Sequence, residues 1–160
     1  MHALETKLGY AFRSPALLEN ALYHSSYANE HRGAGISSNE RLEFLGDAVL
    51  GFVTAEYLYA KHPDLPEGDL TRIRAALVCE ESLHEVAQYL GLGEYLRLGR
   101  GEELGGGRRR PSILADATES VFAAVYLDGG MDAARDIIHR VLLDKEQEEQ
   151  VEERRRDYKT

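Results

Sequence analysis

Apolar residues recur at intervals of three and four along most of the chain, whereas no stretch alternates apolar and polar side chains for long enough to build a sheet. This periodicity is typical of amphipathic helices, so the sequence predicts an all-α fold. The helices are expected at residues 3–8, 15–24, 37–61, 69–78, 81–90 and 112–127, with a last one running from residue 132 into the charged tail.

The expected helix boundaries depend on capping residues and helix breakers. Ser14 precedes Pro15, an arrangement that favours the start of a helix. The spacing of Ser37 and Glu40 fits a capping box at the start of the longest helix, and the His62-Pro63 pair should end that helix. Residues 27–38 are expected to form a polar loop, and the glycine-rich residues 99–111 a mobile basic loop.

Two glycines, Gly46 and Gly51, lie inside the longest predicted helix. An interior glycine costs about 1 kcal/mol of helix stability relative to alanine. We therefore expect another part of the backbone to pack closely against this helix at both positions.

Length and composition favour one compact domain outside the membrane. The chain has 160 residues, of which 43% are hydrophobic, enough for a single core. No apolar run approaches the roughly 20 residues of a membrane span, and the N-terminus has no secretory signal pattern. A cytoplasmic protein is expected, and the single cysteine, Cys79, is interpreted as a small core residue because its neighbours are apolar.

The formal net charge of −9 argues against nucleic-acid binding, which normally uses a surplus of lysine and arginine. This objection weakens if several carboxylates bind metal ions, because bound divalent cations reverse the local charge and can hold phosphate oxygens. The charge balance therefore directs attention to the arrangement of the acidic residues.

The longest predicted helix carries Glu40, Glu43 and Asp47 at positions i, i+3 and i+7. At 3.6 residues per turn these three acids share an arc of about 60° on the helix surface. Considered alone, such a stripe is more simply explained as an acidic face exposed to solvent.

A second helix, at residues 112–127, changes that balance because it places Asp116 and Glu119 among almost exclusively apolar or small residues. Carboxylates removed from water need protons, cationic partners or metal ions. If this helix packs against Gly46, four carboxylates converge, and hard divalent cations would be the natural partners. Ligation by oxygen alone favours magnesium or manganese over zinc.

A di-iron centre is the competing metal hypothesis, since it needs carboxylates together with Glu-x-x-His units in a helix bundle. One such unit is Glu81 with His84, and Asp136 with His139 is an approximate second. Neither pair lies on the helices that carry the acidic clusters, so this hypothesis is disfavoured.

Residues 39–50 (NERLEFLGDAVL) resemble the signature motif of ribonuclease III enzymes. Further segments resemble the family in the same order, and the resemblance covers the chain to about residue 143. One departure is Thr118-Glu119-Ser120, where family members more often have phenylalanine-glutamate-alanine; the acid is kept, so packing is affected rather than catalysis. The further segments are residues 24–30 (HSSYANE), 65–71 (LPEGDLT), 105–108 (GGGR) and 113–130 (ILADATESVFAAVYLDGG).

The resemblance implies a homodimeric endoribonuclease that hydrolyses double-stranded RNA with Mg²⁺, for which Mn²⁺ can substitute. Products would carry 5′-phosphate and 3′-hydroxyl ends with short 3′ overhangs. It implies no membrane and no small-molecule substrate, and it places Phe44 at the dimer interface. The implied metal ligands are Glu43, Asp47, Asp116 and Glu119; the implied catalytic acids are Asp47, Glu119, Glu40 and Glu67; and the candidate RNA-binding residues are Arg108, Arg109 and Arg110.

For domain organisation, the resemblance assigns residues 1–148 to the endonuclease domain and residues 149–160 to a linker and the start of a missing double-stranded-RNA-binding domain. Expected substrates are ribosomal RNA precursors, messenger RNAs and other structured RNAs. One alternative is a small ribonuclease III relative that works without a binding domain, and another is a noncatalytic RNA-binding module. The second is disfavoured because such a module would gain stability by replacing buried acids.

Overall fold

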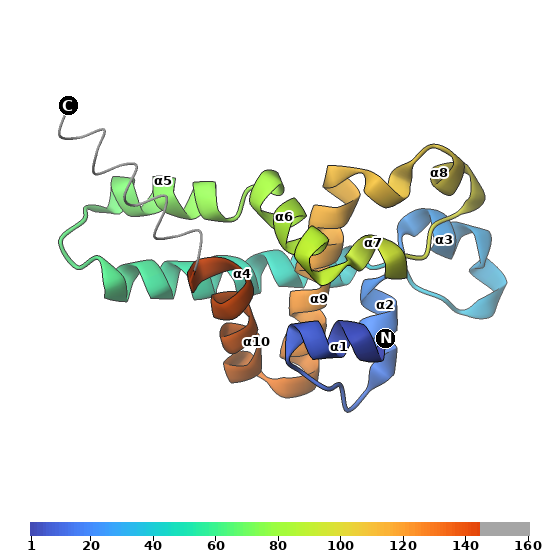
Figure 1. The fold of residues 1–160 in the computed structure, drawn as a ribbon, viewed down its shortest axis with the longest axis horizontal. Coiled ribbons are helices and arrows are strands. Elements are labelled where there is room, and N and C mark those ends of the chain that lie inside the picture. Colours follow the sequence, from blue (N-terminus) through green and yellow to red (C-terminus); the bar gives the residue numbers. More distant parts are fainter. Residues whose placement is uncertain (145–160) are drawn as a thin grey trace.

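The computed structural model describes residues 1–144, and within them it contains helices and no strand (Figure 1). The prediction of an all-α fold is confirmed. None of the described helices is long and apolar enough to cross a membrane. The helices are α1 (His2–Leu8), α2 (Pro15–Ala21), α3 (Ser25–Glu30), α4 (Glu40–Lys61), α5 (Glu67–Leu77), α6 (Glu80–Leu90), α7 (Leu92–Tyr95), α8 (Arg100–Leu104), α9 (Pro111–Gly129) and α10 (Met131–Ile138), with short helical turns η1 (Arg32–Ala34), η2 (Gly107–Arg109) and η3 (His139–Leu143).

Helix α9 forms the centre of the molecule, and α4, α6, α10 and α2 pack around it (Figure 1). Its side chains are apolar or small on nearly every side, so it can be buried along most of its length. Phe122 is fully buried, and burying a side chain of this size contributes about 1.5–3 kcal/mol. Burial of α9 therefore fixes the position of the two acids that it carries, Asp116 and Glu119.

The crossing of α4 and α9 depends on Gly46. A Cβ atom at this position would lie 1.8 Å from the carbonyl oxygen of Glu119, so only glycine permits this approach. Close packing is thus confirmed at Gly46. The same prediction is wrong for Gly51 within the described chain, where an added Cβ would meet no atom within 4 Å.

Tertiary hydrogen bonds, rather than a local capping box, set the start of α4. The helix begins after Asn39, whose backbone N–H donates to the carbonyl of Tyr23 and whose side chain donates to the carbonyl of Ala21. The expected partner of Glu40 was Ser37, but the hydroxyl that contacts its side chain belongs to Ser38. The capping-box prediction is therefore wrong: the N-cap of α4 is Asn39, which makes no side-chain cap hydrogen bond.

Two segments expected to be loops contain helices. Residues 25–30 form α3, because the His24 side chain accepts a hydrogen bond from the backbone N–H of Ser26 and caps the helix. The segment 99–111 contains α8 and η2, which are held together by ion pairs between glutamates of α8 and the following arginines. Histidine is not among the residues that usually cap helices, so the sequence did not indicate α3.

Cys79 also differs from its prediction. It precedes α6 and is exposed, with its thiol donating to the carbonyl of Ala76, and is not a core residue. The expected linker at residues 149–160 lies outside the described residues.

Candidate metal centre

Helices α4 and α9 bring three carboxylates together where they cross. Glu43 lies one turn before Gly46 on α4, and Asp116 and Glu119 lie one turn apart on α9. One carboxylate oxygen from each of these residues lies within 4.8 Å of those of the other two. Oxygen atoms this close, from partly buried side chains, form a set that could hold a divalent cation.

Asp47, the fourth predicted ligand, joins this group through a hydrogen bond with the Glu119 side chain. Besides burial, this contact and the charge of Asp47 both raise the pKa of Glu119, so Asp47 lies beside the α9 acids. The α4 stripe of Glu43 and Asp47 therefore faces α9 as the sequence predicted.

The pKa values of the cluster reflect burial and crowding of negative charge. Burial raises the pKa of Glu119 to about 9, and the hydrogen bond with Asp47 and the charges of Asp47, Glu43 and Asp116 add to this rise. Burial also raises the pKa of Glu43, with further contributions from neighbouring acids. A cation would remove this repulsion, so the donor set and its charge both fit a hard metal ion.

Glu40 and Glu67 lie in different places relative to the cluster. Glu40 is exposed at the start of α4, and its charge raises the pKa of Glu43, so it borders the cluster. Glu67 begins α5, beyond the far end of α4, and its carboxylate accepts a hydrogen bond from Thr71. At 1.5 Å per residue, the helix from Glu43 to Lys61 spans about 27 Å, so a single chain does not bring Glu67 to the cluster.

Two hydroxyl groups beside Glu119 hold its turn of α9 in place. Ser120 contacts the carbonyl of Asn39 at 3.2 Å, which ties α9 to the start of α4. Thr118 contacts the carbonyl of Leu83 on α6 at 3.2 Å. Both residues are fully buried. Sequence reasoning treated them only as departures from a family pattern, although a polar pair flanking an acid in an apolar helix was a usable signal.

The three candidate RNA-binding arginines are not equivalent. Arg108 pairs with Glu103 and donates to the carbonyls of Gly93 and Leu96 at 2.6 and 2.8 Å. Arg110 pairs with Glu102. Arg109 is exposed, and its side chain makes no hydrogen bond or ion pair with another residue of the described range 1–144; only its backbone N–H is bonded, to the carbonyl of Gly106.

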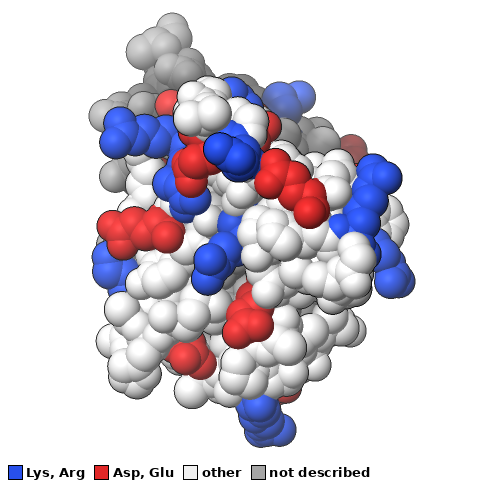
Figure 2. Space-filling view, turned by 90° about the vertical axis from the view of Figure 1, so that its right-hand side faces the viewer, with Lys and Arg blue, Asp and Glu red and all other residues white. Residues whose placement is uncertain are grey.

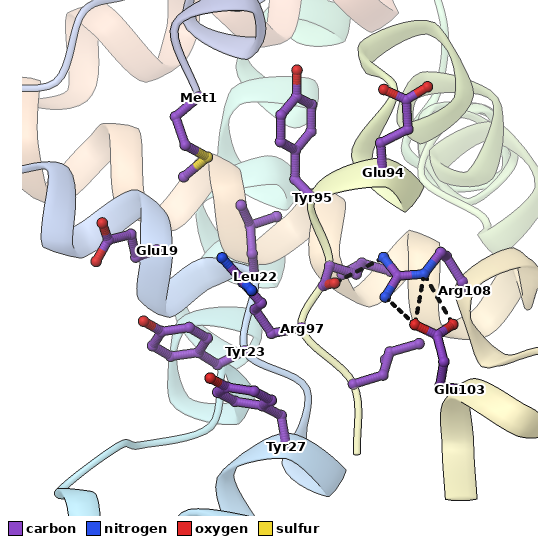
Figure 3. A pocket seen from close by; sticks show the side chains of 12 residues that line it. Met1, Glu19, Leu22, Tyr23, Tyr27, Glu94, Tyr95, Arg97, Glu103 and Arg108 are labelled. Carbon is purple, nitrogen blue, oxygen red and sulfur yellow. Dashed lines mark hydrogen bonds and ion pairs between the residues drawn. The ribbon is translucent and has the colours of Figure 1, made fainter. Parts of the chain in front are cut away.

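The surroundings of Arg108 form a hollow that is separate from the acids. Figure 3 shows the Arg108–Glu103 pair at its edge, with Tyr23, Tyr27 and Arg97 on the opposite wall; no member of the acid cluster lines it. On the face drawn in Figure 2, acidic and basic side chains are interspersed and no continuous basic track is visible. The acids between α4 and α9 are therefore the stronger candidate site.

Comparison with known proteins identifies the family. Residues 14–146 match the model of the family described as ribonuclease-III-like. The chain belongs to the ribonuclease III family. It is 54% identical to Ribonuclease 3 of Oceanobacillus iheyensis over 136 residues, which are 85% of this chain and 60% of that protein. It is 58% identical to Ribonuclease 3 of Symbiobacterium thermophilum over 135 residues, 84% of this chain and 56% of that protein. The chain thus spans less than two thirds of the length of these ribonuclease III relatives.

Solved structures of similar proteins agree with the fold. The nuclease domain of ribonuclease III from Campylobacter jejuni is 42% identical and superposes with a TM-score of 0.82, covering 89% of this chain and 95% of that domain. Dicer from Pichia stipitis is 25% identical, with a TM-score of 0.60 over 81% of this chain and 54% of the Dicer chain. The family and fold predicted from the sequence are therefore confirmed.

Proposed function

We propose that the chain is the catalytic domain of an endoribonuclease that hydrolyses double-stranded RNA with Mg²⁺, which Mn²⁺ can replace. The observation that carries this proposal is the convergence of Glu43, Asp116 and Glu119, joined by Asp47, in a member of the ribonuclease III family. Burial, together with the neighbouring acids, raises the pKa of Glu119 to about 9. A noncatalytic module would have no use for so unfavourable an arrangement.

The chain's own residues would act by binding and orientation. Glu43, Asp47, Asp116 and Glu119 would hold the metal, and Glu119, whose pKa is raised to about 9, would release its proton when the metal binds. Bound Mg²⁺ supplies a Lewis acid that activates water and stabilises charge on the leaving oxygen in hydrolases of this type. Glu40, at the edge of the cluster, is placed to orient water or an approaching phosphate group. Substrates would include ribosomal RNA precursors and other structured RNAs of the cytoplasm.

Incubation of the protein with a labelled RNA duplex tests this proposal. We expect cleavage with Mg²⁺ or Mn²⁺ and none with a chelator, since the acids alone lack a Lewis acid. The products should carry 5′-phosphate and 3′-hydroxyl ends with short 3′ overhangs. The matched control is one strand of the duplex alone, which should stay intact. Equal degradation of both substrates, or cleavage that is insensitive to the chelator, would contradict the proposal.

We also propose a homodimer formed by the exposed face of α4. Phe44, Phe52 and Tyr59 are 81, 52 and 78% exposed, and their spacing places them on one side of the helix, opposite the core. An apolar stripe of this kind on a soluble domain marks an interaction surface. The related C. jejuni structure is described in terms of a region involved in dimer formation. A two-fold interface would supply two equivalent sites for two RNA strands.

Changing Phe44 to aspartate should convert the dimer into a monomer at micromolar concentration, because two charges would be buried in an apolar interface. Sedimentation velocity measures the change directly. The control is Leu104→Asp, which makes the same apolar-to-acidic change at an 87% exposed site on α8 and should leave the dimer intact. A wild-type protein that is monomeric at this concentration and still cuts a duplex efficiently would refute the dimer.

The remaining predicted site residues fit this proposal unequally. Since Glu67 lies beyond the far end of α4, it could join an acid cluster only if a second copy presented it across the dimer interface. Among the three arginines, we propose Arg109 as the phosphate contact, because binding RNA through it leaves the Arg108–Glu103 and Arg110–Glu102 ion pairs intact. Arg108 and Arg110 would have to give up internal partners to play that role.

A further inference from the structure

Three aromatic rings stack in a row beside the hollow that Arg108 borders. The rings of Tyr23 and Tyr27 lie 5.4 Å apart with an angle of 22° between their planes, and those of Tyr27 and His31 lie 4.1 Å apart with an angle of 27°. Tyr27 is the middle ring, whereas Tyr23 stacks on one ring alone within residues 1–144. Because Tyr23 also lines the hollow, its second face can receive another planar group there.

Backbone hydrogen bonds hold Arg97 next to Tyr23. The N–H of Arg97 donates to the carbonyl of Leu22 at 2.9 Å, and its carbonyl accepts the N–H of His24 at 3.1 Å, so two short extended segments pair in parallel. Figure 3 shows the Arg97 side chain beside Tyr23, on the side away from Tyr27. The pairing therefore fixes a cation at the open end of the row of rings.

The charge of Arg97 is available to a ligand. Its side chain is exposed and makes no hydrogen bond or ion pair with another residue between positions 1 and 144, whereas Arg108 across the hollow is paired with Glu103. Glu19 and Glu94 also line the hollow, but both are exposed and lie at its margins in Figure 3. A ligand on this wall thus meets an aromatic face and an unpaired guanidinium together.

The size and lining of the hollow fit a nucleotide. Its volume is about 930 Å³, within the range of about 300–1,000 Å³ that is typical of small-molecule sites, and the buried Leu22 and Leu96 add apolar surface. Nucleobases stack on tyrosine rings, and a guanidinium binds phosphate oxygens through two parallel N–H donors. An organic cation would also favour a tyrosine face, but the charge of Arg97 would repel it.

We propose that this hollow binds a nucleoside phosphate, with the base stacked on the second face of Tyr23 and the phosphate held by Arg97. The inference goes beyond the proposed hydrolysis and does not depend on it, because no metal enters this site. Two sources share this chemistry: a free mononucleotide and an unpaired 5′-terminal nucleotide of an RNA. The carbonyl of Tyr23 accepts the N–H of Asn39, which directly precedes α4, so an RNA nucleotide bound here would lie near the helix that carries Glu40 and Glu43.

Titrations with adenosine 5′-monophosphate, adenosine and ribose 5-phosphate test the two contacts separately. Each is made with a chelator present, and the backbone amide signals of residues 23 and 97 are followed by NMR. Arg97→Gln removes the guanidinium, Tyr23→Leu removes the ring, and Tyr23→Phe keeps it. The matched control is Arg100→Gln, which removes the same charge from an exposed residue of α8 that does not line the hollow.

We expect the monophosphate to bind more tightly than either of its parts. Arg97→Gln should weaken binding of the monophosphate about tenfold and leave adenosine unaffected, because adenosine has no phosphate for the guanidinium to hold. Tyr23→Leu should weaken the monophosphate about tenfold and leave ribose 5-phosphate unaffected, whereas Tyr23→Phe should stay within about threefold of the wild type. Arg100→Gln should bind all three compounds as the wild type does.

A second measurement identifies the source of the nucleotide. Two 5′-phosphorylated RNA duplexes with the same paired sequence, one blunt and one with a single unpaired 5′ nucleotide, are compared by fluorescence anisotropy with a chelator present. Tighter binding of the extended duplex, lost in Arg97→Gln, assigns an RNA nucleotide to the hollow. Equal binding of the two duplexes by a protein that still binds the monophosphate assigns a free mononucleotide.

Amide signals that do not move at millimolar monophosphate would overturn the proposal. Equal losses of adenosine and monophosphate binding in Arg97→Gln would also overturn it, because Arg97 would then not contact the phosphate. If Arg100→Gln weakens the monophosphate as much as Arg97→Gln does, the effect is one of overall charge and the site is refuted. Since every titration contains a chelator, a failure of Mg²⁺-dependent cleavage would leave these outcomes unchanged.

Discussion

Replacing Glu119 by glutamine should reduce Mg²⁺-dependent cleavage by orders of magnitude while leaving the metal-free protein as stable as the wild type or more stable. Glutamine keeps the size and hydrogen bonding of the side chain but removes the charge that attracts a hard cation. It also replaces a carboxyl group that burial and the charges of Asp47, Glu43 and Asp116 keep from ionising in the fold by a side chain that has no charge to lose. Stability and activity should therefore change in opposite directions.

The gain in stability should depend on pH. The pKa of Glu119 is about 9 in the fold and about 4.3 in an unfolded chain. Between these values the folded protein keeps a proton that the unfolded chain has released, so wild-type stability falls as pH rises through this range. Glutamine cannot titrate, so the advantage of the variant should be smallest near pH 5 and grow as the pH rises toward 9.

Thermal melts from pH 5 to pH 9 with a chelator, repeated with Mg²⁺ and accompanied by cleavage rates on one duplex, measure both effects. The matched control is Glu85→Gln, which changes an exposed acid on α6 and should alter neither the melting profile nor the rate. If Glu119 instead stabilised the fold through a cationic partner, its loss would destabilise the protein at neutral pH. A Glu119→Gln protein that melts early and cuts at the normal rate per folded molecule would eliminate the metal-ligand assignment.

Replacing Gly46 by alanine, which adds one methyl group, should destabilise the protein by about 3 kcal/mol or more. The new Cβ would lie 1.8 Å from the carbonyl oxygen and 2.5 Å from the carbonyl carbon of Glu119, and both atoms belong to the backbone of α9. No side-chain rotation can relieve this contact, so α4 and α9 must separate. Because Glu43 and Glu119 lie on the two helices, their separation should also weaken metal binding.

Urea unfolding measures the loss of stability. The free energy of unfolding should fall with urea concentration at the same slope in the variant and the wild type. Gly51→Ala is the control within the same helix, since an added Cβ there meets no atom of the chain within 4 Å. Because alanine has a higher helix propensity than glycine, Gly51→Ala should leave the stability of the protein unchanged or raise it by up to about 1 kcal/mol. Equal stability of the two alanine variants would show that the close approach of α9 is not what requires glycine at position 46.

The sequence by itself determined the helical class of this protein and the identity of its acidic stripes, because both depend on local periodicity. The i, i+3 and i+7 spacing of Glu40, Glu43 and Asp47 fixes their common face on any regular helix, and the apolar surroundings of Asp116 and Glu119 require a buried one. Gly46 also indicated where the two helices meet. These features need no knowledge of distant contacts.

Only the tertiary structure decided the features that depend on contacts between distant residues. The contacts of Ser26 and Glu30 with the backbone N–H groups of Gly99 and Arg100, and of Arg108 with the carbonyls of Gly93 and Leu96, hold two segments whose composition is typical of loops. The charge state of Glu119 follows from how deeply the crossing of α4 and α9 buries it beside Asp47, and no local pattern reports burial. Glu67 looks equivalent to the other acids in sequence, yet it lies at the opposite end of α4 because a helix of 22 residues separates the two ends by about 30 Å.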